Sequence, residues 1–367
     1  MQRPTHISSE IPPESKKKNI LFLISSIGGG GAERVACRLV SEFIKNNNVY
    51  LMYFQEKENT YYISPKVNLI SFSKIHQEYI NKGCYIKNMK LLRIIEIEKI
   101  RRKYNINITI SFLHQPNILN VTAGGCELKI CSERNDPEGK GIDYFNEMTS
   151  SYEKADKVVF QTNYTKNKFS FQIKNKSVII PNPICVTCLA DRIPNKKIVG
   201  VGRLVPQKNH ELLIKAFAIF HKIHNEYILE IYGIGPLLDE LVLLVKELGL
   251  NNYIFFKGFS NEVHEKIKDA EQFVLSSNYE GMPNALMEAM MMGLPCISTN
   301  CSGVSEIIEH EKNGILVEKG DEVSLAREMT RLCENKELRE KIGKNARIKA
   351  EEWKLDKIVQ KWEALFD

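Results

Sequence analysis

The chain has 367 residues, 43% of them apolar and 26% charged, with 51 lysines and arginines against 45 aspartates and glutamates. This length favours two domains and supplies a real core, so a collagenous, wholly disordered or disulfide-scaffold protein is excluded. The net charge of +6 is uneven: residues 1–190 carry +10 and residues 191–367 carry −4, which suggests different partners for the two halves.

The chain contains no apolar run of the roughly 18–20 residues that a membrane-spanning helix needs. Residues 1–18 are polar and lysine-rich, and we expect a flexible leader without the apolar centre of a secretory signal. The nine cysteines are an odd number, which agrees with free thiols. We therefore expect a cytoplasmic protein with reduced cysteines.

The first part of the chain, residues 19–183, alternates short apolar runs with helical patterns, including a helix expected from Gly31 to Asn46. This alternation predicts a parallel sheet with crossover helices. The expected strands are Asn19–Ser25, Val49–Phe54, Ile106–Phe112, Leu128–Cys131, Val158–Gln161 and Ser177–Ile180.

Pro181, Asn182 and Pro183 end this first part, because proline interrupts helices and central strands. We expect a linker over residues 184–196 and a second domain over residues 197–350. Both domains are predicted to be Rossmann-like, doubly wound α/β sheets, which bind ligands beyond the carboxyl ends of their strands. The expected strands of the second domain are Ile198–Val201, Ile228–Tyr232, Ile254–Lys257, Gln272–Leu275, Pro295–Ser298 and Ile315–Val317, and its helices are 209–223, 236–249, 261–269, 283–292 and 321–334.

Four glycines, Gly28–Gly31, follow the first expected strand and precede a helix. Glycines let the backbone approach a ligand closely, and a helix N-terminus favours an anion such as phosphate. An ordinary tight turn is the alternative. The loop is not a P-loop, and Glu33 and Arg34 stand where a dinucleotide fingerprint would need its third glycine.

Two glutamates lie beyond an expected strand of the second half. Glu280 falls in the loop after Leu275, and Glu288 lies about one and a half turns inside the next helix, which Pro283 starts. Carboxylates beside free N–H groups suit a ligand with vicinal hydroxyls and phosphates, such as a nucleotide sugar. Two unrelated solvated glutamates are the alternative, although the helix around Glu288 is so apolar that a carboxylate there needs a partner.

Arg203 and Lys208 flank the loop after the strand expected at Ile198–Val201. Arginine offers a bidentate fork and lysine a mobile point charge, a combination that suits a diphosphate. Two merely exposed bases are the alternative.

Together these features resemble the retaining glycosyltransferases of family 4, which have the GT-B architecture. The start of the chain is similar to the branch that builds bacterial surface polysaccharides. The resemblance spans nearly the whole chain and rests on GGGGAER (28–34), HQPN (114–117), SERNDP (132–137), VGRLVPQKN (201–209), YGIGP (232–236), KGF (257–259), NYEGMPNALMEAMMMGLPCIST (278–299), GVSEII (303–308) and NGILVEKGD (313–321).

The resemblance implies roles for the matched residues. Arg203 and Lys208 would hold the donor diphosphate and neutralise charge on the leaving group. Glu280 would bind the transferred sugar, and Glu288 would accept hydrogen bonds from the ribose. The implied catalytic set is Glu280, His114, Arg203 and Lys208, and the other implied donor contacts are Gly29, Gly30, Gly31, Gly258, Phe259, Gly281, Met282, Asn284 and Ala285.

Three further expectations come from the resemblance. Some family members carry a histidine at the position of His114 in contact with the transferred sugar, and a plain polar loop residue is the alternative. Arg134 and Gly31 would contact the acceptor. Residues 351–367 would form a helix that crosses back to the first domain.

No metal or other cofactor is expected. The chain contains no D-x-D sequence that could hold a metal on the donor diphosphate. Arg203 and Lys208 would therefore supply the positive charge in place of a metal. Retention in this family is ascribed to same-face displacement, so the two glutamates are not assigned as a glycosidase acid and nucleophile. Cys185 and Cys188 have C-x-x-C spacing but no matching second pair.

Residues 82–103 combine many lysines and arginines with methionine, leucine and isoleucine. A basic amphipathic helix of this kind can lie on an anionic membrane surface, and an ordinary crossover helix with a solvated basic face is the alternative. The sequence has neither basic motifs with stacking aromatics nor zinc modules, so nucleic acid is not an expected partner.

The sequence thus predicts a retaining, metal-independent glycosyltransferase at the inner face of the cytoplasmic membrane. It would move a hexose or N-acetylhexosamine from a nucleoside-diphosphate sugar, with UDP expected, to a lipid-linked oligosaccharide. A nucleotide-sugar epimerase of the same architecture and a non-catalytic partner that binds sugar nucleotides are the rival hypotheses.

Overall fold

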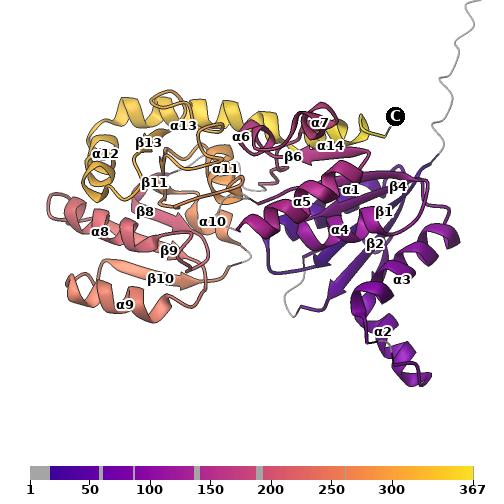
Figure 1. Ribbon diagram of the computed structural model, residues 1–367. Coiled ribbons are helices and arrows are strands. Elements are labelled where there is room, and N and C mark those ends of the chain that lie inside the picture. Colours follow the sequence, from indigo (N-terminus) through magenta and orange to yellow (C-terminus); the bar gives the residue numbers. More distant parts are fainter. Residues whose placement is uncertain are drawn as a thin grey trace, which may run out of the picture.

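The computed structural model describes residues 17–57, 61–85, 87–135, 141–186, 193–260 and 262–366. These residues form two lobes side by side, each built on one sheet with helices on both faces (Figure 1). Every strand pair in both sheets is parallel. The predicted fold class, two doubly wound parallel sheets, is confirmed.

The first lobe contains a seven-stranded sheet with the order β3-β2-β1-β4-β5-β6-β7. Its strands are β1 (Asn19–Ser26), β2 (Asn48–Gln55), β3 (Asn68–Ser71), β4 (Ile108–Phe112), β5 (Leu128–Ser132), β6 (Lys157–Phe160) and β7 (Ser177–Ile179). Its helices are α1 (Gly31–Phe43), α2 (Phe72–Asn81), α3 (Met89–Lys103), α4 (His114–Thr122), α5 (Ile142–Lys154), α6 (Asn163–Asn167) and α7 (Phe171–Asn175).

Strand β1 is buried on both faces, which explains its continuous apolar sequence. Ile20 and Phe22 point into a cluster with α1, whereas Leu21 and Leu23 point to the opposite face, where Leu92 of α3 packs. Side chains of a strand alternate between faces, so that one apolar run can hold two helical layers.

The second lobe contains a six-stranded sheet with the order β10-β9-β8-β11-β12-β13. Its strands are β8 (Asn195–Val201), β9 (Ile228–Tyr232), β10 (Ile254–Gly258), β11 (Ala270–Leu275), β12 (Cys296–Thr299) and β13 (Ile315–Val317). Its helices are α8 (His210–His221), α9 (Leu238–Glu247), α10 (Val263–Ile267), α11 (Asn284–Met291), α12 (Glu322–Glu334) and α13 (Lys336–Ala350).

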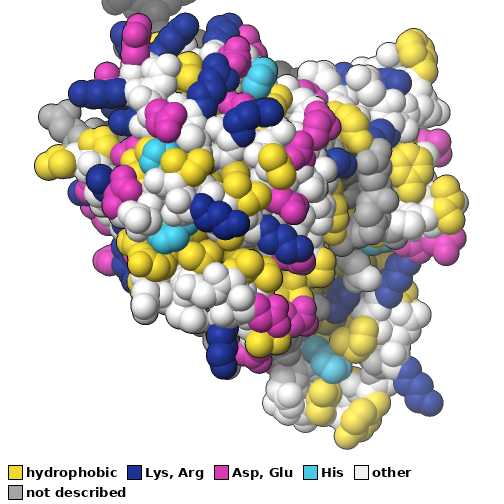
Figure 2. Space-filling view, turned by 90° about the vertical axis from the view of Figure 1, so that its left-hand side faces the viewer, with side chains coloured by type: hydrophobic (Ala, Val, Ile, Leu, Met, Phe, Trp, Pro, Cys, Tyr) yellow, Lys and Arg dark blue, Asp and Glu magenta, His cyan; other side chains and the backbone are white. Residues whose placement is uncertain are grey.

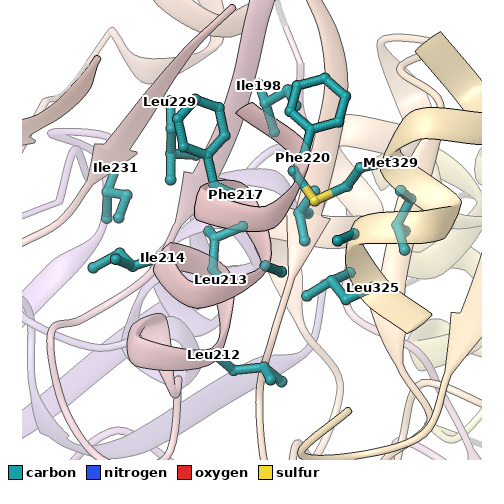
Figure 3. Packing of buried hydrophobic residues seen from close by; sticks show 14 of the residues in the cluster. Ile198, Leu212, Leu213, Ile214, Phe217, Phe220, Leu229, Ile231, Leu325 and Met329 are labelled. Atoms are coloured by element: carbon teal, nitrogen blue, oxygen red, sulfur yellow. The ribbon is translucent and has the colours of Figure 1, made fainter. Parts of the chain in front are cut away.

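The core of the second lobe forms around α8. Leu213, Phe217 and Phe220 of this helix are fully buried and meet Ile198 of β8, Leu229 of β9 and Met329 of α12 (Figure 3). Burying one such side chain stabilises the fold by roughly 1.5–3 kcal/mol. Val274 of β11 belongs to the same cluster. The core therefore holds β8 and β11 in place, and the carboxyl ends of these two neighbouring strands lead into the candidate site.

The end of the chain returns to the first lobe. In Figure 1 the yellow segment runs from α13 over the second lobe to α14 (Leu355–Glu363) beside the first. Ile358 and Trp362 of α14 are fully buried in the cluster formed by β1 and α1, and Trp362 stacks on Phe112 with ring centroids 5.7 Å apart. The first lobe thus depends on residues from the far end of the chain. The domain boundaries at 19–183, 184–196 and 197–350 stay a prediction.

One strand and one helix of the first lobe bear on the expectations from the sequence. Strand β3 was not predicted, because Asn68 and Leu69 are exposed and the strand has no apolar run. Helix α3 is a crossover helix packed on the sheet, as in the alternative named for residues 82–103, and most of its basic residues are exposed. Two of them are exceptions. Arg93 lies over the rings of Phe54 and Phe72, and Arg101 is buried.

In the second lobe, positive and negative side chains are interspersed on the end that Figure 2 displays, with an apolar band between them. This mixture agrees with the small net charge of residues 191–367. Across the described ranges, no helix is both long and apolar enough to span a bilayer.

Candidate functional site

The loop after β11 brings Glu280 against Lys208. The Lys208 ammonium donates a hydrogen bond to Glu280 Oε1 at 2.5 Å, and Ser277 Oγ donates to the same oxygen at 2.6 Å. Glu280 is only 5% exposed, and a carboxylate so deeply buried needs a countercharge. The two residues come from separate predicted loops, and they meet because β8 and β11 are neighbours in the sheet.

The loop that holds Lys208 is fixed at its end by Asn209. This residue has a left-handed backbone, with φ at 45°, and its side chain caps α8 by accepting a hydrogen bond from Leu212 N at 3.3 Å. Ser276 Oγ also donates to the carbonyl of Lys208 at 3.0 Å. Arg203 lies earlier in the same loop and is exposed, so its guanidinium is open to a ligand.

Glu288 of α11 is buried beneath the junction of the two lobes. Arg34 of α1 lies 2.7 Å from Glu288 Oε1, Arg38 lies 3.7 Å from the same oxygen, and His264 Nε2 lies 3.1 Å from Oε2. Burial alone would raise the pKa of Glu288, but Arg34 and His264 outweigh burial and hold this pKa below its ordinary value. Glu288 is thus an ionised hydrogen-bond acceptor.

The acceptor capacity of Glu288 is not exhausted. Among the described residues, none makes a well-aligned hydrogen bond to Glu288 Oε1, although Arg34 pairs with it electrostatically. A carboxylate oxygen has two lone pairs, so that a ligand hydroxyl could share this oxygen with the guanidinium.

The glycine-rich loop abuts the start of α11. Gly29 has φ at 91°, and α1 begins at Gly31. A Cβ on Gly31 would lie 2.9 Å from Asn284 Nδ2, and a Cβ on Gly30 would lie 2.2 Å from the carboxylate of Glu33. Glycine at position 31 lets the loop approach the second lobe closely, and glycine at position 30 leaves room for the Glu33 side chain of α1.

Two groups of observations therefore meet at one edge of the second sheet: a lysine–carboxylate pair and a buried, ionised glutamate facing a glycine-rich helix start. Residues 192–349 match the family model described as glycosyl transferases group 1. This region belongs to the group 1 glycosyltransferases. The chain accordingly contains a glycosyltransferase group 1 domain.

Relatives cover nearly the whole glycosyltransferase chain. It is 27% identical over 363 residues to the N-acetylgalactosamine-N,N'-diacetylbacillosaminyl-diphospho-undecaprenol 4-alpha-N-acetylgalactosaminyltransferase of Campylobacter jejuni, with 92% of this chain and 96% of that protein covered. It is 24% identical over 360 residues to an uncharacterized glycosyltransferase of Haemophilus influenzae, with 95% and 99% covered.

Solved structures share the fold. TarM matches with a TM-score of 0.82 at 16% identity, with 97% of this chain and all of the TarM chain covered. HepE of Anabaena, solved in complex with UDP and glucose, matches with a TM-score of 0.79 at 17% identity, with 95% and 99% covered. The glycosyltransferase therefore has the two-lobed GT-B fold.

His114 lies at the carboxyl end of β4 in the first lobe of the glycosyltransferase. The preceding Leu113 has φ at 73°, a strained backbone for a bulky residue, and such strain concentrates at functional sites. The imidazole stacks on Tyr144 with ring centroids 4.1 Å apart, and its Nε2 lies 2.8 Å from Glu147 Oε2. Both partners belong to α5, so this helix orients the ring.

The structure places Arg134 inside the protein. Its guanidinium lies over the rings of Phe112 and Trp362, at 4.9 and 5.5 Å, and Nη1 donates to Asn182 Oδ1 at 3.1 Å. Burial lowers the pKa of Arg134 to about 9. A guanidinium in this position does not reach a ligand, so the geometry gives no support to the predicted acceptor contact. Gly31, the other predicted acceptor contact, lies at the lobe junction.

The remaining predicted donor contacts lie on two loops of the second lobe. Gly258 ends β10 with φ at 66°, its carbonyl accepts from Gly233 N at 2.9 Å, and Phe259 beside it is exposed. The predicted contacts Gly281, Met282, Asn284 and Ala285 form the loop and first turn of α11, directly after Glu280. Among the described residues there is no group of three or more histidine, cysteine, aspartate or glutamate side chains that could hold a metal ion, and Cys188 lies outside these residues.

Sequence reasoning missed the side chains that hold Glu288. Arg34 and Arg38 stand on α1, about 250 residues before their carboxylate, and His264 stands on α10. The one available signal was the helical spacing of the two arginines, since residues four apart share a face. That spacing predicts that the two arginines share one face of the helix, but it does not predict which carboxylate they bind.

Proposed function

We propose that this glycosyltransferase is a retaining, metal-independent enzyme that transfers a hexose or N-acetylhexosamine from a UDP-sugar to a hydroxyl of a lipid-linked oligosaccharide. The observation that carries the proposal is the Lys208–Glu280 pair beside the ionised Glu288, all at the carboxyl edge of one sheet. Such an edge is where doubly wound sheets bind nucleotides.

The proposed donor lies across these residues. Lys208 and the exposed Arg203 neutralise the diphosphate, and their charge stabilises the leaving nucleoside diphosphate as the glycosidic bond breaks. Two cations at this point supply the positive charge that a bound metal supplies elsewhere, which supports a metal-independent reaction. Glu288 accepts hydrogen bonds from the ribose hydroxyls.

Glu280 binds hydroxyls of the transferred sugar. Because Lys208 and Ser277 already hold one oxygen of Glu280, the carboxylate is fixed in position, and its negative charge favours the positive sugar ring of the transition state. His114 approaches the sugar from the first lobe. The acceptor hydroxyl attacks the anomeric carbon on the same face from which the leaving group departs. The configuration at that carbon is therefore retained.

The relatives support the choice of substrates. The Campylobacter relative is named for an alpha-N-acetylgalactosaminyl transfer onto a diphospho-undecaprenol glycan, and HepE was solved with UDP and glucose. An alpha linkage retains the configuration of an α-linked UDP-sugar. By analogy, we place the reaction at the inner face of the cytoplasmic membrane, with a peripheral contact to anionic lipid through the basic first lobe.

The test is transfer and donor hydrolysis by Lys208→Ala and Glu288→Ala variants. Removing a charged group that stabilises the transition state costs roughly 100- to 1000-fold in kcat, and we expect this loss for Lys208→Ala. For Glu288→Ala we expect mainly a higher KM for the donor. Lys215→Ala is the matched control, because Lys215 pairs with Glu211 on the surface of α8. Wild-type rates in both site variants would refute the assignment.

Two further measurements separate the rivals. An epimerase converts the donor without an acceptor, so NMR of the UDP-sugar incubated alone would reveal a second sugar. A non-catalytic partner would bind UDP in calorimetry and never form product. Sedimentation with liposomes rich in anionic lipid at low salt tests the membrane contact, which high salt should weaken.

A further inference from the structure

Asn182 lies where the chain leaves the first lobe, and its side chain joins the interior of that lobe to the start of α11. The residue is 4% exposed. Its Oδ1 accepts hydrogen bonds from Gln161 Nε2 at 2.7 Å and Arg134 Nη1 at 3.1 Å. On the other side, its Nδ2 donates to Asn284 Oδ1 at 2.6 Å and to the carbonyl of Met282 at 3.4 Å.

The donor and acceptor directions in this chain of contacts follow from Arg134. A guanidinium has only donors, so the atom of Asn182 that faces it must be the acceptor Oδ1. The Nδ2 of Asn182 then points at Asn284. Because this Nδ2 is a donor, Asn284 must turn its acceptor Oδ1 toward it. The Nδ2 of Asn284 is consequently turned to the opposite side.

That opposite side is the glycine-rich loop. A Cβ on Gly31 would lie 2.9 Å from Asn284 Nδ2, so only a glycine leaves this space open. Within the ranges that the structure describes, Asn284 Nδ2 has no acceptor, whereas Asn284 Oδ1 is engaged by Asn182. The amide therefore holds a free N–H donor toward the junction of the two lobes.

We propose that Asn182 is a positioning residue for the donor, which orients the Asn284 amide so that Nδ2 donates a hydrogen bond to a phosphate oxygen of the nucleotide sugar. The inference rests on the proposed function and adds to it a side-chain donor and the residue that aims it. A phosphate ester at neutral pH offers only acceptors toward this group, so an amide with the reverse orientation would present its carbonyl oxygen and repel the phosphate.

The decisive variant is Asn182→Asp. An aspartate keeps two acceptors for Arg134 and Gln161, and the buried guanidinium gives its charge a partner, so the variant should fold even though it loses the long hydrogen bond to the Met282 carbonyl. However, it has no donor for Asn284. The Asn284 amide must then rotate to donate its Nδ2 to the new carboxylate, and its oxygen turns to the glycine-rich loop.

We expect the nucleoside diphosphate to bind Asn182→Asp roughly 10- to 100-fold more weakly, as for the loss of a hydrogen bond to a charged group. Calorimetry would use whichever of UDP, GDP and ADP stabilises the wild type most. The matching nucleoside, which has no phosphate, should bind equally to both proteins. A merely structural role of Asn182 predicts equal losses of affinity for the nucleoside and the diphosphate, and that result would overturn the proposal.

A double-mutant cycle gives a second readout. Asn284→Ala alone should weaken diphosphate binding about 10-fold, and adding Asn182→Asp to it should cause little further loss, because no amide is left to rotate. Additive losses would overturn the proposal. If Asn182→Asp fails to fold, Asn284→Ala decides: unchanged diphosphate binding would refute the donor role of its amide.

Glu288→Gln separates this inference from the proposed function. If this variant binds the diphosphate like the wild type, the donor site itself is misassigned. If it binds more weakly while Asn182→Asp does not, the donor site stands and the orienting role of Asn182 is wrong.

Discussion

Glu280 and Glu288 stand on the same loop and helix, yet the structure holds them in different ways. Glu280 is held by Lys208 and Ser277, both from the second lobe. Glu288 is held by Arg34 and Arg38, which reach it from the first lobe, and by His264 of the second lobe. The surroundings of Glu280 therefore depend on the fold of one lobe, whereas the charge balance at Glu288 depends on how the two lobes meet.

The largest effects are expected from the two tryptophans, which test how far each lobe is independent. Trp362 is buried in the first lobe, and Trp353 is buried in the second, although they are only nine positions apart in the sequence. Either Trp→Ala variant should lower the free energy of unfolding by about 3–5 kcal/mol. Hydrogen exchange should localise the loss to the first lobe for Trp362→Ala and to the second for Trp353→Ala. Losses in the same lobe would contradict the division.

Glu280→Gln tests the pair that lies within one lobe. The amide keeps the shape but removes the charge that faces Lys208 and, in the proposed reaction, the positive sugar ring. We expect kcat for transfer to fall roughly 100- to 1000-fold, while the diphosphate still binds to Lys208. Glu211→Gln on the surface of α8 is the control. A fall in diphosphate affinity with unchanged kcat would reverse the roles assigned to this pair.

His210 offers a pH test that concerns the second lobe alone. Burial lowers the pKa of His210 to about 4, from an ordinary 6.5. Between these values the unfolded chain binds a proton that the folded protein does not, so stability falls as the pH drops from about 6.5 to about 4. The loss approaches 3 kcal/mol, at about 1.4 kcal/mol per pH unit. In urea titrations His210→Gln should lose this slope, and an unchanged slope would exclude His210 as its source.

The smallest effect is expected at the junction of the lobes. Arg34→Gln leaves the buried Glu288 with less countercharge and should cost roughly 1–2 kcal/mol near pH 7. Because the pKa of Glu288 is lowered in the fold, its ionisation stabilises the protein above about pH 4.5 and ceases to do so as the pH falls through its folded pKa. The difference from the wild type should therefore shrink in acid. Arg38→Gln, whose contact is longer, should cost less.

Much of the fold could be predicted because each buried strand is a short apolar run. The runs at Asn19–Ser25 and Ile228–Tyr232 correspond to β1 and β9 within a residue. Strand β3 has no such run, since its first two residues face solvent, and backbone pairing with β2 makes it a strand. The basic pattern of residues 82–103 likewise does not reveal that one of its bases is internal: Arg101 pairs with the buried Glu127 at 2.6 Å. Whether this segment contacts a membrane stays a prediction.

The loops of the candidate site could be located from the sequence, but their contacts could not. Lys208 and Glu280 each follow a recognisable strand, and the neighbouring order of β8 and β11 then brings them together. Arg134 also follows a strand, yet its side chain turns inward, because Phe112 and Trp362 offer it aromatic faces and Asn182 offers an acceptor. No local pattern distinguishes these two outcomes.

The sequence by itself determined the two doubly wound sheets and the glycine-rich loop. It also located Arg203, Lys208, Glu280 and Glu288 in the segments that follow strands, because strand periodicity and loop position are local properties. It also determined the uneven charge of the halves. Only the tertiary structure decided that Arg34 pairs with Glu288, that Asn182 reaches Asn284, and that α14 completes the first lobe. These contacts join residues that are 100 to 350 positions apart, and their partners are chosen by packing in space.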